Sequence, residues 1–272
     1  MKTRFFYNDS TNLEDFSTQL NNYQQGSAQI TMLSNHALYI GQECAFNHLY
    51  FKLSQLNINP ADLTVKLWDG TVWREVAELI DETNGFTESG FLTWTPNKDE
   101  TSWSREDTDE GVTGLEDVKV YDLFWIQITS SADLSQLTLD WVGQKFCEDE
   151  DLYSLYPLLM QSNMKTAFTP GKTDWEEQIA AASREIVRDL VRAGVISDSG
   201  NVLRRDLLLD ACIHKTAEIV FRPFGDDYDK KKVGAHGDYK AALNLKRYKT
   251  DKNNNAILDS NERRSRTGFL TR

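Results

Sequence analysis

The chain has 272 residues and a formal net charge of −12, with 40% hydrophobic and 26% charged residues. This balance is typical of globular proteins and excludes disordered and fibrous classes. No apolar run approaches the roughly 18–20 residues that cross a bilayer, and residues 1–12 lack the apolar stretch of a signal peptide. Cys44, Cys147 and Cys212 are odd in number and far apart, so we expect no disulfide framework or zinc motif and a reducing compartment.

Charge is distributed unevenly along the chain. Residues 1–156 carry 9 Lys+Arg against 26 Asp+Glu, a net of −17, whereas residues 157–272 carry 21 against 16, a net of +5. Such asymmetry predicts two units with different partners. The alternative is that the acidic residues only keep an aromatic-rich protein soluble. An acidic surface of this strength repels nucleic acid unless its charges are locally segregated, so nothing in the first half supports a general DNA-binding groove.

The N-terminal part is predicted to form an antiparallel, jelly-roll-like β-sandwich. Short runs with alternating apolar residues, separated by turn residues, extend from residue 28 to about residue 146. Asp69-Gly70 predicts a hairpin turn, because both residues tolerate positive φ. Alternation predicts that each strand has one buried and one solvent-exposed face. The expected strands lie at 49–53, 63–68, 71–73, 91–94, 118–129 and 136–141.

A polar, acidic stretch from residue 95 to residue 117 is expected to be a surface loop. Trp103, isolated there among polar residues, is the tryptophan expected to be exposed. Exposed aromatic rings stack on sugars, so a carbohydrate-binding sandwich is the alternative function, although tryptophans in alternating strands are more often part of a core. The candidate rings are Trp68, Trp73, Trp94, Trp103 and Trp125.

The C-terminal part is predicted to be helical, which gives an α+β fold with a sandwich domain at 1–156 and a helical domain with an extended tail at 157–272. The residues Thr173-Asp174-Trp175-Glu176 match a capping box, and Gly194 stands where a helix C-cap is expected. Further helices are expected at about 204–221 and 236–248. The buried face of the first helix is predicted to comprise Trp175, Ile179, Ala182, Ile186 and Leu190.

The helix at 204–221 is apolar around nearly its whole circumference, which predicts burial among neighbours that include other subunits. The expected interface residues are Leu207, Leu208, Ile213 and Val220.

Motifs for common enzyme chemistry are incomplete in this chain. Gly171-Lys172-Thr173 resembles the end of a phosphate-binding loop, but Thr166 stands in place of its first glycine. The four histidines are dispersed, and no nucleophile-elbow motif occurs. We therefore expect no enzymatic activity and no required cofactor. A glycoside hydrolase, which needs two carboxylates brought together in space, is the remaining enzymatic alternative.

The segment Asp251–Glu262 has the spacing of a twelve-residue calcium loop, because alternate positions offer oxygen ligands to a hard cation. Ala256 replaces the usual glycine and two carboxylates are replaced by asparagine, so any calcium affinity is expected to be weak. The alternative is a polar turn without metal. The candidate ligands are Asp251, Asn253, Asn255, Ile257, Asp259 and Glu262.

The end of the chain forms a short basic tail. A tail of this kind orders against an acidic groove on a partner or remains a solvated terminus. Its candidate partner-binding residues are Arg263, Arg264, Arg266 and Arg272.

In their order along the chain, these C-terminal features resemble the head–tail connector (adaptor, or head-completion) proteins of long-tailed bacteriophages. The resemblance covers about residues 173–272: a capped helix, an apolar helix ending at Phe221-Arg222-Pro223, a third helix, and the Asp/Asn-rich turn that precedes Glu262-Arg263-Arg264. Residues 124–134 are similar to β-sandwich modules of phage structural proteins. The preceding sandwich is an addition relative to the shortest connectors.

The resemblance implies a virion protein of the phage neck, assembled in the host cytoplasm as a homo-oligomeric ring of about a dozen copies beneath the portal. The helices would form the ring, the basic tail would bind the portal protein, and other neck or tail-terminator proteins would be neighbours. Genomic DNA would pass through the lumen without sequence-specific binding. No membrane partner is expected.

Overall fold

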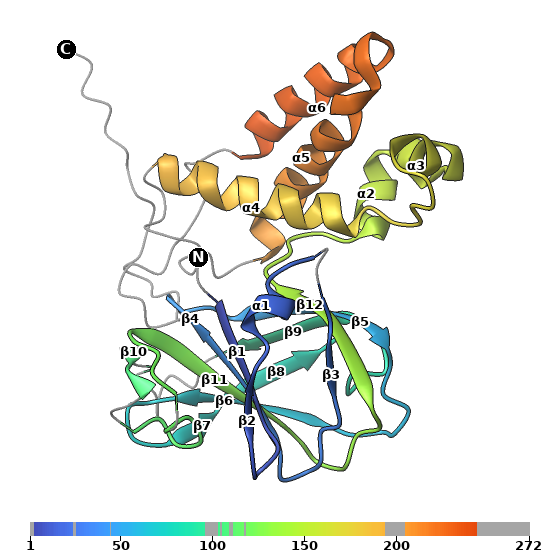
Figure 1. Ribbon diagram of the computed structural model, residues 1–272. Helices are drawn as coiled ribbons and strands as arrows, with labels where there is room; N and C mark the ends of the chain where they lie inside the picture. The colour runs from blue at the N-terminus through green and yellow to red at the C-terminus, as the bar shows by residue number, and fades with distance from the viewer. Residues whose placement is uncertain are drawn as a thin grey trace, which may run out of the picture. The chain divides into compact units, whose positions relative to one another are not determined.

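The computed structural model describes residues 3–23, 26–43, 45–95, 103, 105–108, 111–116, 118–193 and 205–243. This part of the chain forms two compact units, which we call the sandwich unit (described residues up to 143) and the helical unit (described residues 144–243) (Figure 1). Two antiparallel sheets in the first unit and several helices in the second confirm the α+β class. Within these ranges, no helix combines the length and apolar character that crossing a membrane requires.

The boundary between the units lies earlier than the predicted junction after Tyr156. Helix α2 (Asp149–Leu155) and the residues before it belong to the helical unit, because Phe146, Cys147 and Leu152 are buried in its core. The acidic run at the predicted junction is instead the first turn of this helix, where negative charge is favourable.

The first sheet of the sandwich unit has the strand order β2-β1-β4-β11-β6-β7, with β10 paired beside β11. Every pairing in it is antiparallel. Strands β1, β2 and β4 were not predicted from the sequence, and β10 lies in the stretch that was expected to be a loop. The strands are β1 (Thr3–Asn8), β2 (Leu13–Asp15), β4 (Ala37–Gln42), β6 (Leu63–Trp68), β7 (Trp73–Glu75), β10 (Arg105–Glu106) and β11 (Leu123–Ser130).

The second sheet has the order β3-β12-β5-β9-β8 and is also antiparallel. Its three longest strands coincide with the predicted runs near residues 49, 91 and 137. A short helix, α1 (Ser17–Leu20), precedes this sheet in the chain. The strands are β3 (Ala28–Ile30), β5 (His48–Gln55), β8 (Glu78–Asp81), β9 (Gly90–Thr95) and β12 (Leu137–Gly143).

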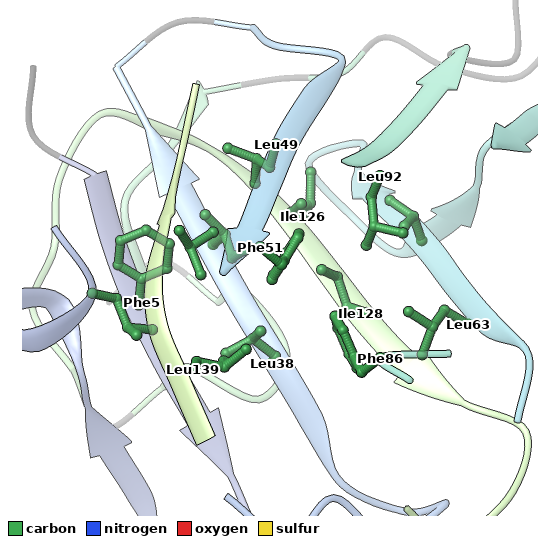
Figure 2. Packing of buried hydrophobic residues seen from close by; sticks show 14 of the residues in the cluster. Phe5, Leu38, Leu49, Phe51, Leu63, Phe86, Leu92, Ile126, Ile128 and Leu139 are labelled. Atoms are coloured by element: carbon green, nitrogen blue, oxygen red, sulfur yellow. The ribbon is translucent and has the colours of Figure 1, made fainter. Parts of the chain in front are cut away.

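One apolar core joins the two sheets. Figure 2 shows Leu38 and Ile128 of the first sheet with Phe51 and Leu139 of the second, and all four belong to one cluster of buried side chains. Because successive side chains of a strand point to opposite faces, the period-two pattern places one set of residues in this core. The predicted sandwich is therefore confirmed at the level of its two packed sheets.

The outer face of the first sheet is also apolar, so the prediction of a wet face is wrong for this sheet. Tyr39 and Trp125 lie there in a second buried cluster that includes Val112 and Leu115. These two aliphatic residues belong to the predicted surface loop, part of which packs down on the sheet. Gly114 has φ +92°, and a Cβ at this position would collide with the Tyr39 hydroxyl, which explains the glycine.

The hairpin predicted at Asp69-Gly70 is confirmed, but its turn is longer than two residues. Trp68 pairs with Trp73, and the Asp69 N–H donates to the Val72 carbonyl at 3.2 Å. Only Gly70 within this turn has positive φ, at +94°. The Asp69 carboxylate instead closes the turn by accepting a backbone N–H from Val72 at 2.8 Å.

The helical unit has a separate core formed by the faces of its helices. Helix α5 packs against α2, α4 and α6. The elements are α2, η2 (Pro157–Met160), α3 (Ser162–Phe168), α4 (Glu176–Arg192), η4 (Arg205–Leu207), α5 (Leu209–Phe221), η5 (Arg222–Tyr228) and α6 (Asp229–Ala242).

The helix predicted behind Trp175 is confirmed as α4, and all five residues of its predicted face are fully buried. The described helix ends at Arg192, and Gly194 lies outside the described residues. Helix α5 begins a few residues later than predicted, after the single turn of η4. Helix α6 begins earlier than predicted, because the chain turns within η5 and the Lys-rich residues that follow are already helical.

Candidate functional site

Two of the predicted sites lie outside the described residues. These are the basic tail and the candidate calcium loop at Asp251–Glu262, and both stay predictions. Among the residues that are described, no group of three or more His, Cys, Asp or Glu side chains is arranged to hold a metal ion. The tail residues concerned are Arg263, Arg264, Arg266 and Arg272.

The predicted subunit interface on α5 is largely wrong. Leu208, Ile213 and Val220 are buried in the core of their own chain, because α2, α4 and α6 surround this helix. The apolar circumference of α5 thus has an intramolecular explanation. Leu207, at the end of η4, is 36% exposed and remains available to a neighbour.

A buried cluster of charges joins α4, α5 and α6. The Lys215 ammonium on α5 lies 2.9 Å from the Glu185 carboxylate of α4 and 3.0 Å from the Glu218 carboxylate one turn along α5. The same ammonium lies 4.7 Å from the ring centroid of Tyr239 on α6, a cation–π distance. Because Lys215 is only 5% exposed, these partners replace water around a buried charge.

The cluster continues to the surface through two further partners of Glu218. Its carboxylate accepts hydrogen bonds from Arg222 at 3.0 Å and from His236 at 3.1 Å. At the opposite edge, the Tyr239 hydroxyl donates to Asp189 at 2.8 Å. Burial and this carboxylate raise the pKa of Tyr239, so its hydroxyl stays a donor at neutral pH. The sequence did not predict the cluster, because its most distant members, Glu185 and Tyr239, are 54 positions apart.

Glu218 should make the helical unit sensitive to acid. Burial acts to raise the pKa of Glu218, but hydrogen bonds from His236 and Lys215 and the charge of Lys215 lower it below the ordinary value of 4.5. A carboxyl whose folded-state pKa is depressed stabilises the fold above its unfolded pKa and loses that contribution as pH falls through the folded value. We therefore expect Glu218→Gln to destabilise the unit at pH 7, with the difference from wild type shrinking below about pH 4.5.

Urea unfolding of both proteins across this pH range measures the difference. The exposed Asp226→Asn exchange serves as a control and should change the free energy of unfolding by less than about 0.5 kcal/mol at pH 7. A Glu218→Gln difference that is constant with pH would contradict the assignment.

The start of α4 is fixed by a carboxylate from α2. The Asp149 carboxylate accepts the backbone N–H of Trp175 at 3.0 Å and the Tyr153 hydroxyl at 2.7 Å. The Trp175 indole N–H donates to the Leu159 carbonyl at 2.7 Å. Thr173 does not act as the predicted cap, because Trp175 occupies the N-cap position and has no side-chain cap bond. Burial raises the pKa of Asp149.

An apolar groove of about 340 Å³ lies between the α2–η2 segment and the α5–α6 pair. Leu155 and Leu158 line it from one side and Phe221 and Ala235 from the other. Leu155, which lines the groove, is 50% exposed. An exposed apolar groove of this kind is typical of interaction sites.

A different part of the unit exposes another apolar residue. Val191, in the last turn of α4, is 38% exposed. The N-terminal end of α4 is the end that contacts α2 and η2, through Trp175. At 1.5 Å per residue, the seventeen-residue helix places Val191 roughly 20 Å or more from that end. The helical unit therefore carries an exposed apolar groove and, well separated from it, the exposed Val191.

The structure does not provide the aromatic platform that carbohydrate binding was expected to use. Trp103 is only 4% exposed, and its indole N–H donates to the Trp125 carbonyl at 3.0 Å, so the prediction of an exposed Trp103 is wrong. Trp68, Trp94 and Trp125 are buried as well. Trp73 is half-buried, and its indole N–H donates to the backbone of the segment that covers the sheet.

Taken together, the described residues place a buried ion cluster, a fixed helix start, an apolar groove and an exposed valine on the helical unit. Comparisons with protein-family models, with curated proteins and with solved structures found no significant match to this chain.

Proposed function

We propose that the protein is a structural adaptor of the neck of a long-tailed bacteriophage, where copies form a ring that joins the portal to the tail around the DNA passage. The observation that carries the proposal is the helical unit: three successive helices, α4, α5 and α6, share a core of their own and leave apolar areas exposed at separate places. These helices precede the basic tail in the order that resembles phage connectors.

A closed ring requires heterologous contacts, in which one patch of each copy meets a different patch of the next. Two separate apolar features of the helical unit meet this requirement. One is the groove lined by Leu155, and the other is the exposed Val191 near the end of α4. In the proposed ring, the end of α4 in one copy covers the groove of its neighbour.

Ion pairs and hydrogen bonds between its helices also make the helical unit rigid at the proposed contacts. Lys215 and Glu218 tie three helices together, and Asp149 fixes the start of α4. These bonds connect the walls of the groove to the end of the unit that carries Val191. A rigid unit loses little conformational entropy when it assembles.

The charges of the chain agree with the proposed partners. The strongly acidic N-terminal part lacks the attraction to phosphates that makes DNA bind, so DNA can pass it without sticking. Other neck or tail-terminator proteins are the proposed partners of this acidic N-terminal part. The Arg residues of the C-terminal tail are proposed to bind carboxylates of the portal protein, because guanidinium groups form bidentate pairs with them.

Ring assembly is tested by placing a charge on the groove. We expect Leu155→Glu or Gly234→Glu to abolish oligomers, because a carboxylate cannot be buried in an apolar contact without a partner. Leu155 is 50% exposed and a Cβ at Gly234 would meet no atom within 4 Å, so the fold should be retained. Sedimentation velocity measures the oligomeric state, and circular dichroism verifies the fold.

The matched control is Ile58→Glu in the sandwich unit, where the side chain is 81% exposed. It introduces the same charge away from the helical unit and should leave oligomers intact. Oligomers that survive both groove substitutions, or that are lost equally with the control, would contradict the proposed interface.

A further inference from the structure

The structure brings together two cysteines that the sequence had suggested were unrelated. Cys147 lies just before α2 and Cys212 in the first turn of α5, 65 positions apart. Their sulfur atoms are 2.9 Å apart, and both side chains are fully buried. A disulfide bond has an S–S length of about 2.05 Å, so the two sulfurs need to approach by less than about 1 Å.

The two thiols occupy different environments. Burial raises the pKa of the Cys147 thiol, and Cys147 donates its S–H to the sulfur of Cys212. Burial also acts to raise the pKa of Cys212, but this donated hydrogen bond lowers it. The Ser183 hydroxyl, 3.6 Å from Cys212, provides a further polar contact. Cys212 therefore ionises more readily to the thiolate. The Cys147 sulfur is placed to react with a sulfenic acid formed on Cys212.

We propose that Cys147 and Cys212 form a reversible disulfide that ties the segment before α2 to α5. The oxidant is a small hydroperoxide, a class able to reach a buried sulfur when the unit opens locally. The Cys212 thiolate attacks the peroxide oxygen, the O–O bond breaks, and the leaving oxygen takes the proton of Cys147. The Cys147 thiolate then displaces hydroxide from the Cys212 sulfenic acid, which forms the S–S bond, and the hydroxide takes up the proton that Cys212 released on ionising, so that water leaves. Two thiols lose two electrons and the peroxide gains them.

The bond would lock the groove described above. Leu155 of α2 lies in one wall and Phe221 of α5 in the other, and the crosslink joins the segments that carry these walls. The biological consequence rests on the proposed function: the neck is assembled in a reducing cytoplasm and then leaves the host for an oxidising medium. Oxidation after release would therefore make the assembled unit more rigid.

The test uses the purified full chain, reduced and then treated with hydrogen peroxide. Free thiols are alkylated under denaturing conditions and located by peptide mass mapping. We expect a crosslinked peptide pair containing Cys147 and Cys212, alkylation at Cys44, and full recovery of three alkylated cysteines after reduction with dithiothreitol. The Cys44→Ser variant should give the same crosslink, and Cys147→Ser should give none.

Peroxide-treated wild-type chain in which Cys147 and Cys212 are both still alkylated would overturn the proposal, and so would a crosslink that contains Cys44. This decisive readout needs no variant, so it holds even if Cys147→Ser fails to fold. It also needs no ring and no portal, so failure of the disulfide and failure of the adaptor function are separate results.

Discussion

Replacing Trp175 by alanine is expected to lower the free energy of unfolding of the helical unit by about 3–5 kcal/mol, the usual cost of removing a fully buried tryptophan. The side chain is fully buried at the start of α4 and meets Phe168 edge-on, with ring centroids 5.3 Å apart. Its indole N–H is bonded to the Leu159 carbonyl. Removal leaves both a cavity and a buried carbonyl without its partner.

Trp175→Phe separates these two effects, because it keeps an aromatic ring and removes only the N–H and part of the volume. Its expected cost is smaller, about 1–2 kcal/mol. Leu155→Ala, at a half-exposed position, should cost less than about 0.5 kcal/mol. Urea unfolding measures these values, and hydrogen exchange locates the loss at α2 and α4. A cost below about 1 kcal/mol for Trp175→Ala would show that α4 is not anchored as described.

Lys215→Met is expected to cost about 2–4 kcal/mol, because it keeps the aliphatic length of the side chain but leaves buried carboxylates without their cation. The effect should be at the lower end of the cost of breaking a buried pair. Glu185 is partly exposed, and Glu218 keeps its bonds from Arg222 and His236. Urea unfolding at pH 7 measures the cost.

The double variant Lys215→Met with Glu218→Leu is the matched control. It removes the unpaired charge as well, so at least half of the lost stability should return. Arg222 and His236 are exposed enough to be solvated after the change. If the two substitutions simply add, Lys215 stabilises the unit through packing rather than through its charge.

Local pattern was sufficient to predict the elements whose neighbours lie nearby in the sequence. The buried face of α4 follows from helical periodicity alone, and the longer strands β5, β6, β9, β11 and β12 follow from alternation, although β1 and β4 were not predicted. The Asp69-Gly70 hairpin was also predictable, because its turn residues restrict the backbone locally.

The features that were missed depend on distant partners. Asp149, rather than Thr173, fixes the start of α4, and Val112 and Leu115 cover a sheet that was expected to be wet. Helix α5 is apolar around its circumference because α2, α4 and α6 of the same chain surround it. Periodicity in the sequence cannot distinguish such packing from a contact with another subunit. The pairing of Cys147 with Cys212 and the cluster around Lys215 likewise depend on how helices pack, which a single sequence does not specify.

The central claim is that the chain joins copies of itself to a portal. Mass photometry of the full chain, alone and mixed with the portal protein of the proposed phage, tests this most directly. The account predicts particles whose mass is a whole-number multiple of the chain, and a larger species that contains the portal ring. A single monomeric species at all concentrations, unchanged by the portal protein, would contradict it.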